Sequence, residues 1–204
     1  FQSIFKASPK TTTVYIALAE LEDGLGHVKA AETALQTAVQ MNPEDLLAKA
    51  ALAKFELYKG NFQAALTAAL PALQKLPRNP ALLEAAGRAR LALGRTGDAI
   101  ANFKTLVEVV PNAAWPRVLL ASAFAADGIS ASAVTQANDA LKIEPDNVAA
   151  KLVLIHEYLA TNKLDQARAL VAEIKQSAPD DFAVNDADGT VAQALRTWQS
   201  GALR

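Results

Sequence analysis

Residues that could carry out chemistry are few in this sequence, and their spacing argues against catalysis. The histidines, His27 and His156, lie far apart, and no Asp or Glu cluster joins them at the spacing of metal ligands. Cysteine is absent, which excludes thiolate chemistry and disulfides. The hydroxyl residues have no periodic relation to His156, so no Ser-His-Asp triad can be derived. We therefore expect a non-enzyme with no metal and no cofactor.

Two kinds of short segment resemble ligand-binding loops. The glycines of segments 24–26 and 94–97 could form phosphate loops, but such a loop follows a strand, whereas these lie at turns between helices. Segment 186–189 resembles part of a calcium loop, yet Val184 and Leu195 stand where that loop needs its first and last acidic ligands. Both interpretations are therefore disfavoured.

The dominant feature of the sequence is a repeat of 34 residues (77 − 43, for example). It is marked by prolines Pro9, Pro43, Pro77, Pro111, Pro145 and Pro179. Alanines recur at the same interval at Ala31, Ala65, Ala99, Ala133 and Ala167, and turn formers recur at Gly26, Gly60, Gly94, Gly128 and Asn162. A fixed period in this range indicates a stack of identical supersecondary units.

Each unit can be interpreted as an antiparallel helical hairpin. Polar caps for a first helix follow the prolines at Asp45, Asn79, Asn147 and Asp181, and Ala113 is the exception. The glycine or asparagine then ends that helix in a left-handed conformation, and the proline ends the second helix. The five repeats are 12–45, 46–79, 80–113, 114–147 and 148–181, with turns near 25–27, 59–61, 93–96, 127–129 and 161–163.

This pattern resembles the tetratricopeptide repeat (TPR) family. Repeat three supplies the family's small residue at position 8 (Gly87), its alanine at 20 (Ala99), its aromatic at 24 (Phe103) and its proline at 32 (Pro111). The sequence departs from the pattern at position 4 in Lys49, Arg117 and Lys151, and at position 11 in Glu22, Glu56 and Arg90. The resemblance implies an all-α fold, a TPR-type α-solenoid of antiparallel helix pairs in a right-handed superhelix.

The ends of the chain extend the same array. Residues 1–11 match the end of a truncated repeat, so we expect a helix over 1–7 that packs through Ile4 and Phe5. Residues 182–204 begin like a further first helix and then leave the template, which predicts a partial repeat or a capping helix. We therefore expect residues 1–204 to form a single solenoid.

The resemblance implies a scaffold that binds a protein or peptide on its concave face, through positions 2, 5, 9 and 12 of the first helices. The candidate binding residues are Leu47, Lys54, Leu57, Glu84, Arg88, Leu91, Trp115, Val118, Ser122, Leu152 and His156. Repeat one is acidic instead, with Glu20 and Asp23. Trp115 could equally cover the uncapped start of its helix, and Lys54 and Arg88 could be solvated charges.

The sequences of segments 82–111 and 140–170 are similar to those of TPR lipoproteins of the bacterial PEP-CTERM system. That similarity implies a role in exopolysaccharide export or protein sorting, in the periplasm or attached to the outer membrane. Two alternatives stay open: a solenoid that binds the exported carbohydrate, and an array that self-associates through its ends. A net charge of −1 gives no support to a nucleic-acid partner, and no stretch approaches the roughly 20 apolar residues of a transmembrane helix.

Overall fold

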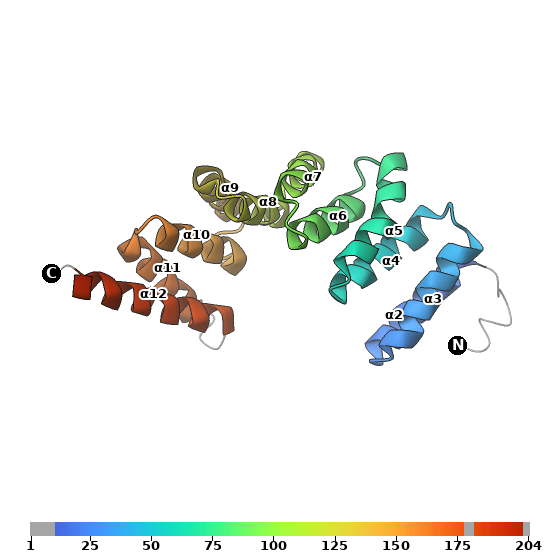
Figure 1. The fold of residues 1–204 in the computed structure, drawn as a ribbon, viewed down its shortest axis with the longest axis horizontal. Coiled ribbons are helices and arrows are strands. Elements are labelled where there is room, and N and C mark those ends of the chain that lie inside the picture. Colours follow the sequence, from blue (N-terminus) through green and yellow to red (C-terminus); the bar gives the residue numbers. More distant parts are fainter. Residues whose placement is uncertain (1–10, 178–181, 202–204) are drawn as a thin grey trace. The chain divides into compact units, whose positions relative to one another are not determined.

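The computed structural model describes residues 11–177 and 182–201, and in this part of the chain every regular element is an α-helix (Figure 1). The helices are α2 (Thr12–Gly24), α3 (Val28–Met41), α4 (Leu46–Tyr58), α5 (Phe62–Lys75), α6 (Pro80–Ala92), α7 (Thr96–Val109), α8 (Ala114–Ala126), α9 (Ser130–Ile143), α10 (Val148–Ala160), α11 (Leu164–Ser177) and α12 (Phe182–Gly201). The all-α fold of paired helices is confirmed. The helix expected over 1–7 lies outside the described residues.

The turn inside each hairpin has the expected backbone conformation. Gly26, Gly60, Gly94 and Gly128 have φ between +73° and +78°, and Asn162 takes the same left-handed region with φ +56°. The amide of the following residue then donates back across the turn; His27 N–H, for example, bonds the carbonyl of Glu22 at 2.8 Å. This closure satisfies carbonyls that the end of a helix leaves open, so each first helix stops at its turn former.

The start of the first helix depends on the residue after the proline. Asp45 accepts hydrogen bonds from the amides of Leu47 and Ala48, and Asn79 and Asn147 cap α6 and α10 in the same way. Ala113 provides no side-chain cap for α8, as the sequence predicts. Asp181 lies outside the described residues.

The polar residues at position 11 are used to hold the turn. Glu22 lies 2.8 Å from Nδ1 of His27, and Glu56 accepts a 2.8 Å hydrogen bond from Nδ2 of Asn61. Glu56 is buried, so this amide is what keeps its carboxylate satisfied. A carboxylate that reaches the turn therefore takes the place of the family's tyrosine in repeats one and two.

Other departures from the family pattern form ion pairs and hydrogen bonds between helices. Lys151 of α10 is buried, and its Nζ lies 2.6 Å from Oε1 of Glu173 on α11. Arg90 of α6 donates to Oδ1 of Asn102 on α7. These charged residues therefore join the two helices of their own repeats, where a hydrophobic side chain would be expected.

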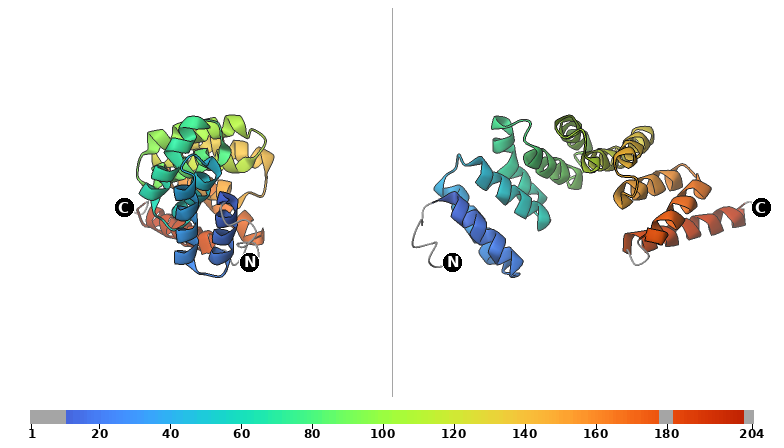
Figure 2. Two further views of the ribbon diagram at one scale, coloured as in Figure 1. Left: turned by 90° about the vertical axis from the view of Figure 1, so that its right-hand side faces the viewer. Right: turned by 180° about the vertical axis from the view of Figure 1, so that it is seen from behind.

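The chain divides into two compact units, one ending at Val109 and the other beginning at Val110. In the first unit, α2 contacts α4 and α4 contacts α6; in the second, α8 contacts α10 and α10 contacts α12. The second helices α3, α5, α9 and α11 each contact the first helix of their own repeat and that of the next repeat, and α7 contacts α6 of its own repeat. Figure 2 shows the same hairpins from two further directions. The expectation of one single domain stays a prediction.

The core of each repeat lies between its two helices and is rich in alanine. There the small residue at position 8 packs against a larger residue at position 24, most clearly in repeat three, where Gly87 faces the fully buried ring of Phe103. In repeat one the two positions are Ala19 and Leu35, both buried in one cluster. The small residue of each pair allows the close approach of the two helices.

Candidate functional site

The eleven candidate residues share one property: each keeps part of its side chain accessible. Positions 2, 5, 9 and 12 fall on one face of a helix because they are separated by three or four residues. Those with exposed side chains are Leu47, Lys54, Arg88, Trp115 and His156; those half-buried are Leu57, Glu84, Leu91, Val118, Ser122 and Leu152. Their placement on accessible surface permits binding, and their role as a site stays a prediction.

Four candidates of the second unit lie together in one groove. We call it the α8–α10 groove; its volume is about 480 Å³. It is lined by Val118, Ser122, Ala125 and Ala126 of α8 and by Ala149, Leu152, Val153 and His156 of α10. The hydroxyl of Ser122 donates to the carbonyl of Val118 at 3.0 Å, so its proton is already used within α8. The groove is therefore mainly apolar, and its polar side chains are this hydroxyl and one imidazole.

That imidazole is held at one edge by a buried carboxylate. Nδ1 of His156 lies 3.1 Å from Oε1 of Glu157, whose side chain is 2% exposed. A carboxylate can only accept, so Nδ1–H donates in this pair, and Nε2 is the acceptor whenever the ring is neutral. The His156 side chain is 70% exposed, and Nε2 is available to accept from a ligand that enters the groove.

Trp115 lies near the start of α8 and does not line the groove. Its exposed fraction is 36%, so about two-thirds of the side chain is covered. The helix it begins has no side-chain cap. Both interpretations of Trp115, as a binding anchor and as a cover for this helix start, are compatible with that position.

The two predicted cations of the first unit have different environments. Arg88 forms an ion pair with Glu84, one turn earlier on α6, at 2.8 Å between Nε and Oε1. Lys54 of α4 has no ion-pair or hydrogen-bond partner among the described residues. The charge of Arg88 is therefore paired within α6, whereas that of Lys54 is not paired within its own helix.

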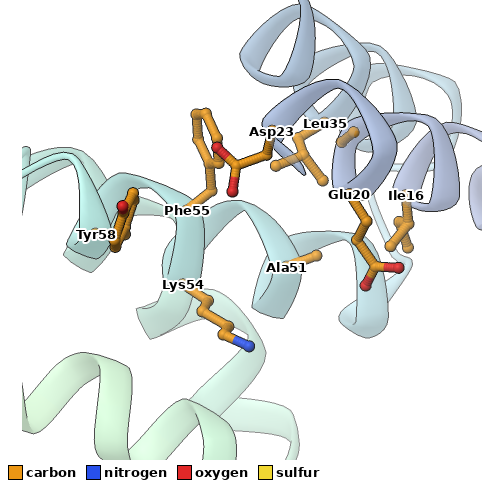
Figure 3. A pocket seen from close by; sticks show the side chains of 9 residues that line it. Ile16, Glu20, Asp23, Leu35, Ala51, Lys54, Phe55 and Tyr58 are labelled. Atoms are coloured by element: carbon orange, nitrogen blue, oxygen red, sulfur yellow. The ribbon is translucent and has the colours of Figure 1, made fainter. Parts of the chain in front are cut away.

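Lys54 belongs to a recess that sequence reasoning did not identify, which we call the α2–α4 pocket (Figure 3). Its volume is about 220 Å³, and it is lined by Ile16, Ala19, Glu20, Asp23, Leu35, Ala51, Lys54, Phe55 and Tyr58. Glu20 and Asp23 are the acidic positions that distinguish repeat one in the sequence. Their proximity to Lys54 of the next repeat depends on how α2 packs on α4.

Two further searches bear on other kinds of site. No group of three or more His, Asp or Glu side chains within residues 11–177 and 182–201 is arranged to hold a metal ion. None of the helices in the described part combines the length and the apolar character that crossing a bilayer requires.

Comparison with known proteins places these repeats in a family. Sequence profiles described as "Tetratricopeptide repeat" match residues 16–80, 51–118, 84–147 and 124–187. No significant relative is found among curated proteins.

Solved structures are similar over almost the whole chain. A thermophilic TPR protein from Thermus thermophilus is 26% identical, with a TM-score of 0.70, over 91% of this chain and 99% of that one. A tetratricopeptide repeat protein from Parabacteroides merdae ATCC 43184 is 17% identical, with a TM-score of 0.77, over 90% and 73%. YrrB, described as a TPR protein with an unusual peptide-binding site, is 16% identical, with a TM-score of 0.71, over 92% and 97%.

Proposed function

Because the chain belongs to the tetratricopeptide repeat family, whose members bind protein or peptide partners, we propose that it is a non-catalytic scaffold and that the α8–α10 groove holds a peptide segment of its partner. The observation that carries this proposal is an open apolar groove between two first helices. YrrB has a peptide-binding site on the same fold, which supports a peptide as the class of ligand.

The size and lining of the groove favour a peptide with apolar side chains. Its volume of about 480 Å³ is large enough for more than one side chain, since small-molecule sites typically hold about 300–1,000 Å³. Val118 and Leu152 provide apolar contact from opposite helices, and Nε2 of His156 can accept one hydrogen bond from the peptide. The groove lining contains no carboxylate or amide, the groups that bind sugar hydroxyls, so a carbohydrate ligand is less favoured here.

The direct test of peptide binding is to place a charge in the α8–α10 groove. Val118→Glu places an unpaired carboxylate between α8 and α10, so partner affinity should fall by at least about tenfold. Ala131→Glu adds the same charge at an exposed position of α9, in the other helix layer, and should leave affinity unchanged. Affinity would be measured by titration calorimetry with the purified partner, and circular dichroism would check that both variants keep their helices. Equal binding by the two variants would reject the groove.

Trp115 can be assigned by a second substitution. If it is an anchor, Trp115→Ala lowers partner affinity and leaves the melting temperature in place, because truncating a central tryptophan often costs about 2 kcal/mol or more of binding energy. If it covers the start of α8, the melting temperature falls and affinity does not change. The comparison therefore separates the two interpretations in one variant.

For the partner itself we propose a component of bacterial exopolysaccharide export or protein sorting. What supports this is the similarity of segments 82–111 and 140–170 to the TPR lipoproteins of the PEP-CTERM system. The test is co-purification of the tagged chain with export or sorting proteins from its source organism. Enrichment that disappears with Val118→Glu supports the proposal, and enrichment that is unaffected by that variant contradicts it.

A further inference from the structure

We propose that the α2–α4 pocket is a second recognition site, which takes a large apolar side chain of a peptide that is next to an arginine or lysine. This inference rests on the proposed function, because it assumes a peptide ligand. It names a different site, in the other compact unit, and a chemistry that the α8–α10 groove does not provide.

The floor of the pocket is suited to one side chain. Ile16 and Ala19 of α2, Leu35 of α3 and Phe55 of α4 are buried residues whose remaining surface faces the recess. A volume of about 220 Å³ exceeds the roughly 150 Å³ of a cavity that admits benzene, and it is below the range of cofactor sites. The occupant is therefore a phenyl-sized group and not a small-molecule cofactor.

The α2 side of the rim carries two carboxylates that the fold does not use. Glu20 and Asp23 are exposed and have no ion-pair or hydrogen-bond partner among the described residues. Both lie toward the C-terminus of α2, where the helix dipole disfavours negative charge, and the last turn holds no basic residue. These charges do nothing for the stability of α2, and a cation from outside would relieve their repulsion.

The α4 side of the rim sets where that cation must lie. Figure 3 shows Glu20 and Asp23 on α2, with Lys54 and Tyr58 on α4 across the opening. Lys54 repels a basic group, so the basic side chain of the ligand is directed toward α2. Tyr58 is 82% exposed, and an exposed aromatic face at this point can stack on a guanidinium. Arginine therefore suits the rim better than lysine.

The occupant is thus defined by charge complementarity as well as by shape. Two carboxylates and one ammonium leave the rim with a negative excess, which disfavours an acidic peptide. A surface on which Lys54 and Arg88 were both free cations would have the opposite preference, for an acidic peptide. The difference arises because Arg88 is paired with Glu84, and because Lys54 faces two acids of the preceding repeat.

The test uses short blocked peptides on the complete chain. The probe is acetyl-Gly-Ser-Phe-Arg-Ser-Gly-amide, titrated into the ¹⁵N-labelled protein and followed by amide chemical shifts. We expect saturable shifts at Ala19 and Ala51, which line the pocket. Replacing the peptide's phenylalanine by alanine, or its arginine by glutamate, should weaken binding by about tenfold or more, because each removes the apolar burial or the charge pair.

Matched variants assign the charge preference to the rim. Glu20→Gln combined with Asp23→Asn should lower the affinity for the Phe-Arg peptide by about three- to tenfold, the effect of losing two exposed ion pairs. Glu44→Gln combined with Glu108→Gln removes the same net charge from exposed acids outside the pocket and should have no effect. Lys54→Glu should strengthen binding of the same peptide, a gain that a loss of folding cannot imitate.

The outcomes separate this site from the proposed function. Equal affinity for the Phe-Arg and Phe-Glu peptides overturns the inference. Shifts confined to Val118 and Leu152 overturn it and leave the α8–α10 groove standing, whereas no binding at either place overturns both. Light scattering completes the test: a dimer that the Glu20→Gln, Asp23→Asn variant dissociates would mean that the pocket holds a second copy of the chain, which also overturns the inference.

Discussion

Gly87→Ala is the substitution for which the structure makes the sharpest stability prediction. Gly87 lies inside α6, where alanine is the better helix former by about 1 kcal/mol. A Cβ atom added here would lie 2.8 Å from Cζ and 2.9 Å from Cδ1 of Phe103. Contacts this short cannot persist, so the ring or the helix must move.

The balance between helix propensity and overpacking decides whether Gly87→Ala stabilises or destabilises the protein. Phe103 is completely buried on α7, and the ring has no solvent to move into. Overpacking a filled core costs about 1–3 kcal/mol. Against a helix-propensity gain of about 1 kcal/mol, we expect Gly87→Ala to destabilise the repeat by about 1 kcal/mol, and by up to about 2 kcal/mol if α6 and α7 separate.

The same substitution elsewhere in the repeat is the control. Gly97 lies in the first turn of α7, and a Cβ added there meets nothing within 4 Å. Gly97→Ala should therefore be neutral or stabilise by up to about 1 kcal/mol. Urea denaturation followed by circular dichroism measures the stability of both variants. Hydrogen exchange of the amides in α6 and α7 is measured as well, because repeat arrays need not unfold in one step.

A second substitution shows whether the ring is the cause. Repeat one uses Ala19 and Leu35 at the positions that Gly87 and Phe103 occupy in repeat three. Phe103→Leu combined with Gly87→Ala should therefore recover most of the loss, giving a coupling energy of about 1 kcal/mol. If Gly87→Ala is as stable as the original protein, or if Phe103→Leu gives no recovery, size complementarity at these positions is not what sets the packing.

Three further outcomes follow from single contacts. The pKa of Asp45 is held below its ordinary value by the hydroxyl of Thr12 and the amides of Leu47 and Ala48. The ionised carboxylate therefore stabilises the folded state at neutral pH, and this contribution is lost as the pH falls through the range in which Asp45 is protonated. In acid titrations followed by circular dichroism, Thr12→Val should make the loss of folding stability at low pH smaller. Ala99→Leu, at a fully buried position, should cost about 1–3 kcal/mol in urea denaturation, whereas Ala101→Leu on the exposed side of α7 should be nearly neutral. Asn162 has a φ of +56°, so in thermal melts Asn162→Gly should be nearly neutral and Asn162→Val should cost about 1–2 kcal/mol.

The fold could be predicted because its signals are local. A turn former with positive φ, a polar cap and a proline each act within one turn of the chain, and the 34-residue register repeats them with few exceptions. The ends of the helices therefore follow from residue type alone. Even the exception at Ala113, which leaves α8 without a side-chain cap, is visible in the sequence.

The site could be predicted only in part, because pockets depend on contacts between repeats. The face of each first helix follows from positions 2, 5, 9 and 12, and this places Val118 and Leu152 in one groove. The i, i+4 spacing of Glu84 and Arg88 was a signal that Arg88 is paired. The presence of Asp23 and Lys54 in one pocket has no such local signal, since it depends on the packing of α2 against α4.

The distribution of large and small side chains explains why recesses form on this face. Several of the largest fully buried side chains, among them Leu66, Phe103 and Leu106, come from second helices and fill the space between the two helix layers. Where first helices meet, alanines are prominent, including Ala51 in the α2–α4 pocket and Ala149 in the α8–α10 groove. Small residues let two helices meet but leave apolar surface uncovered above the contact. A partner's side chain can bury that surface without displacing any part of the core, which suits a scaffold whose ligand must bind and leave.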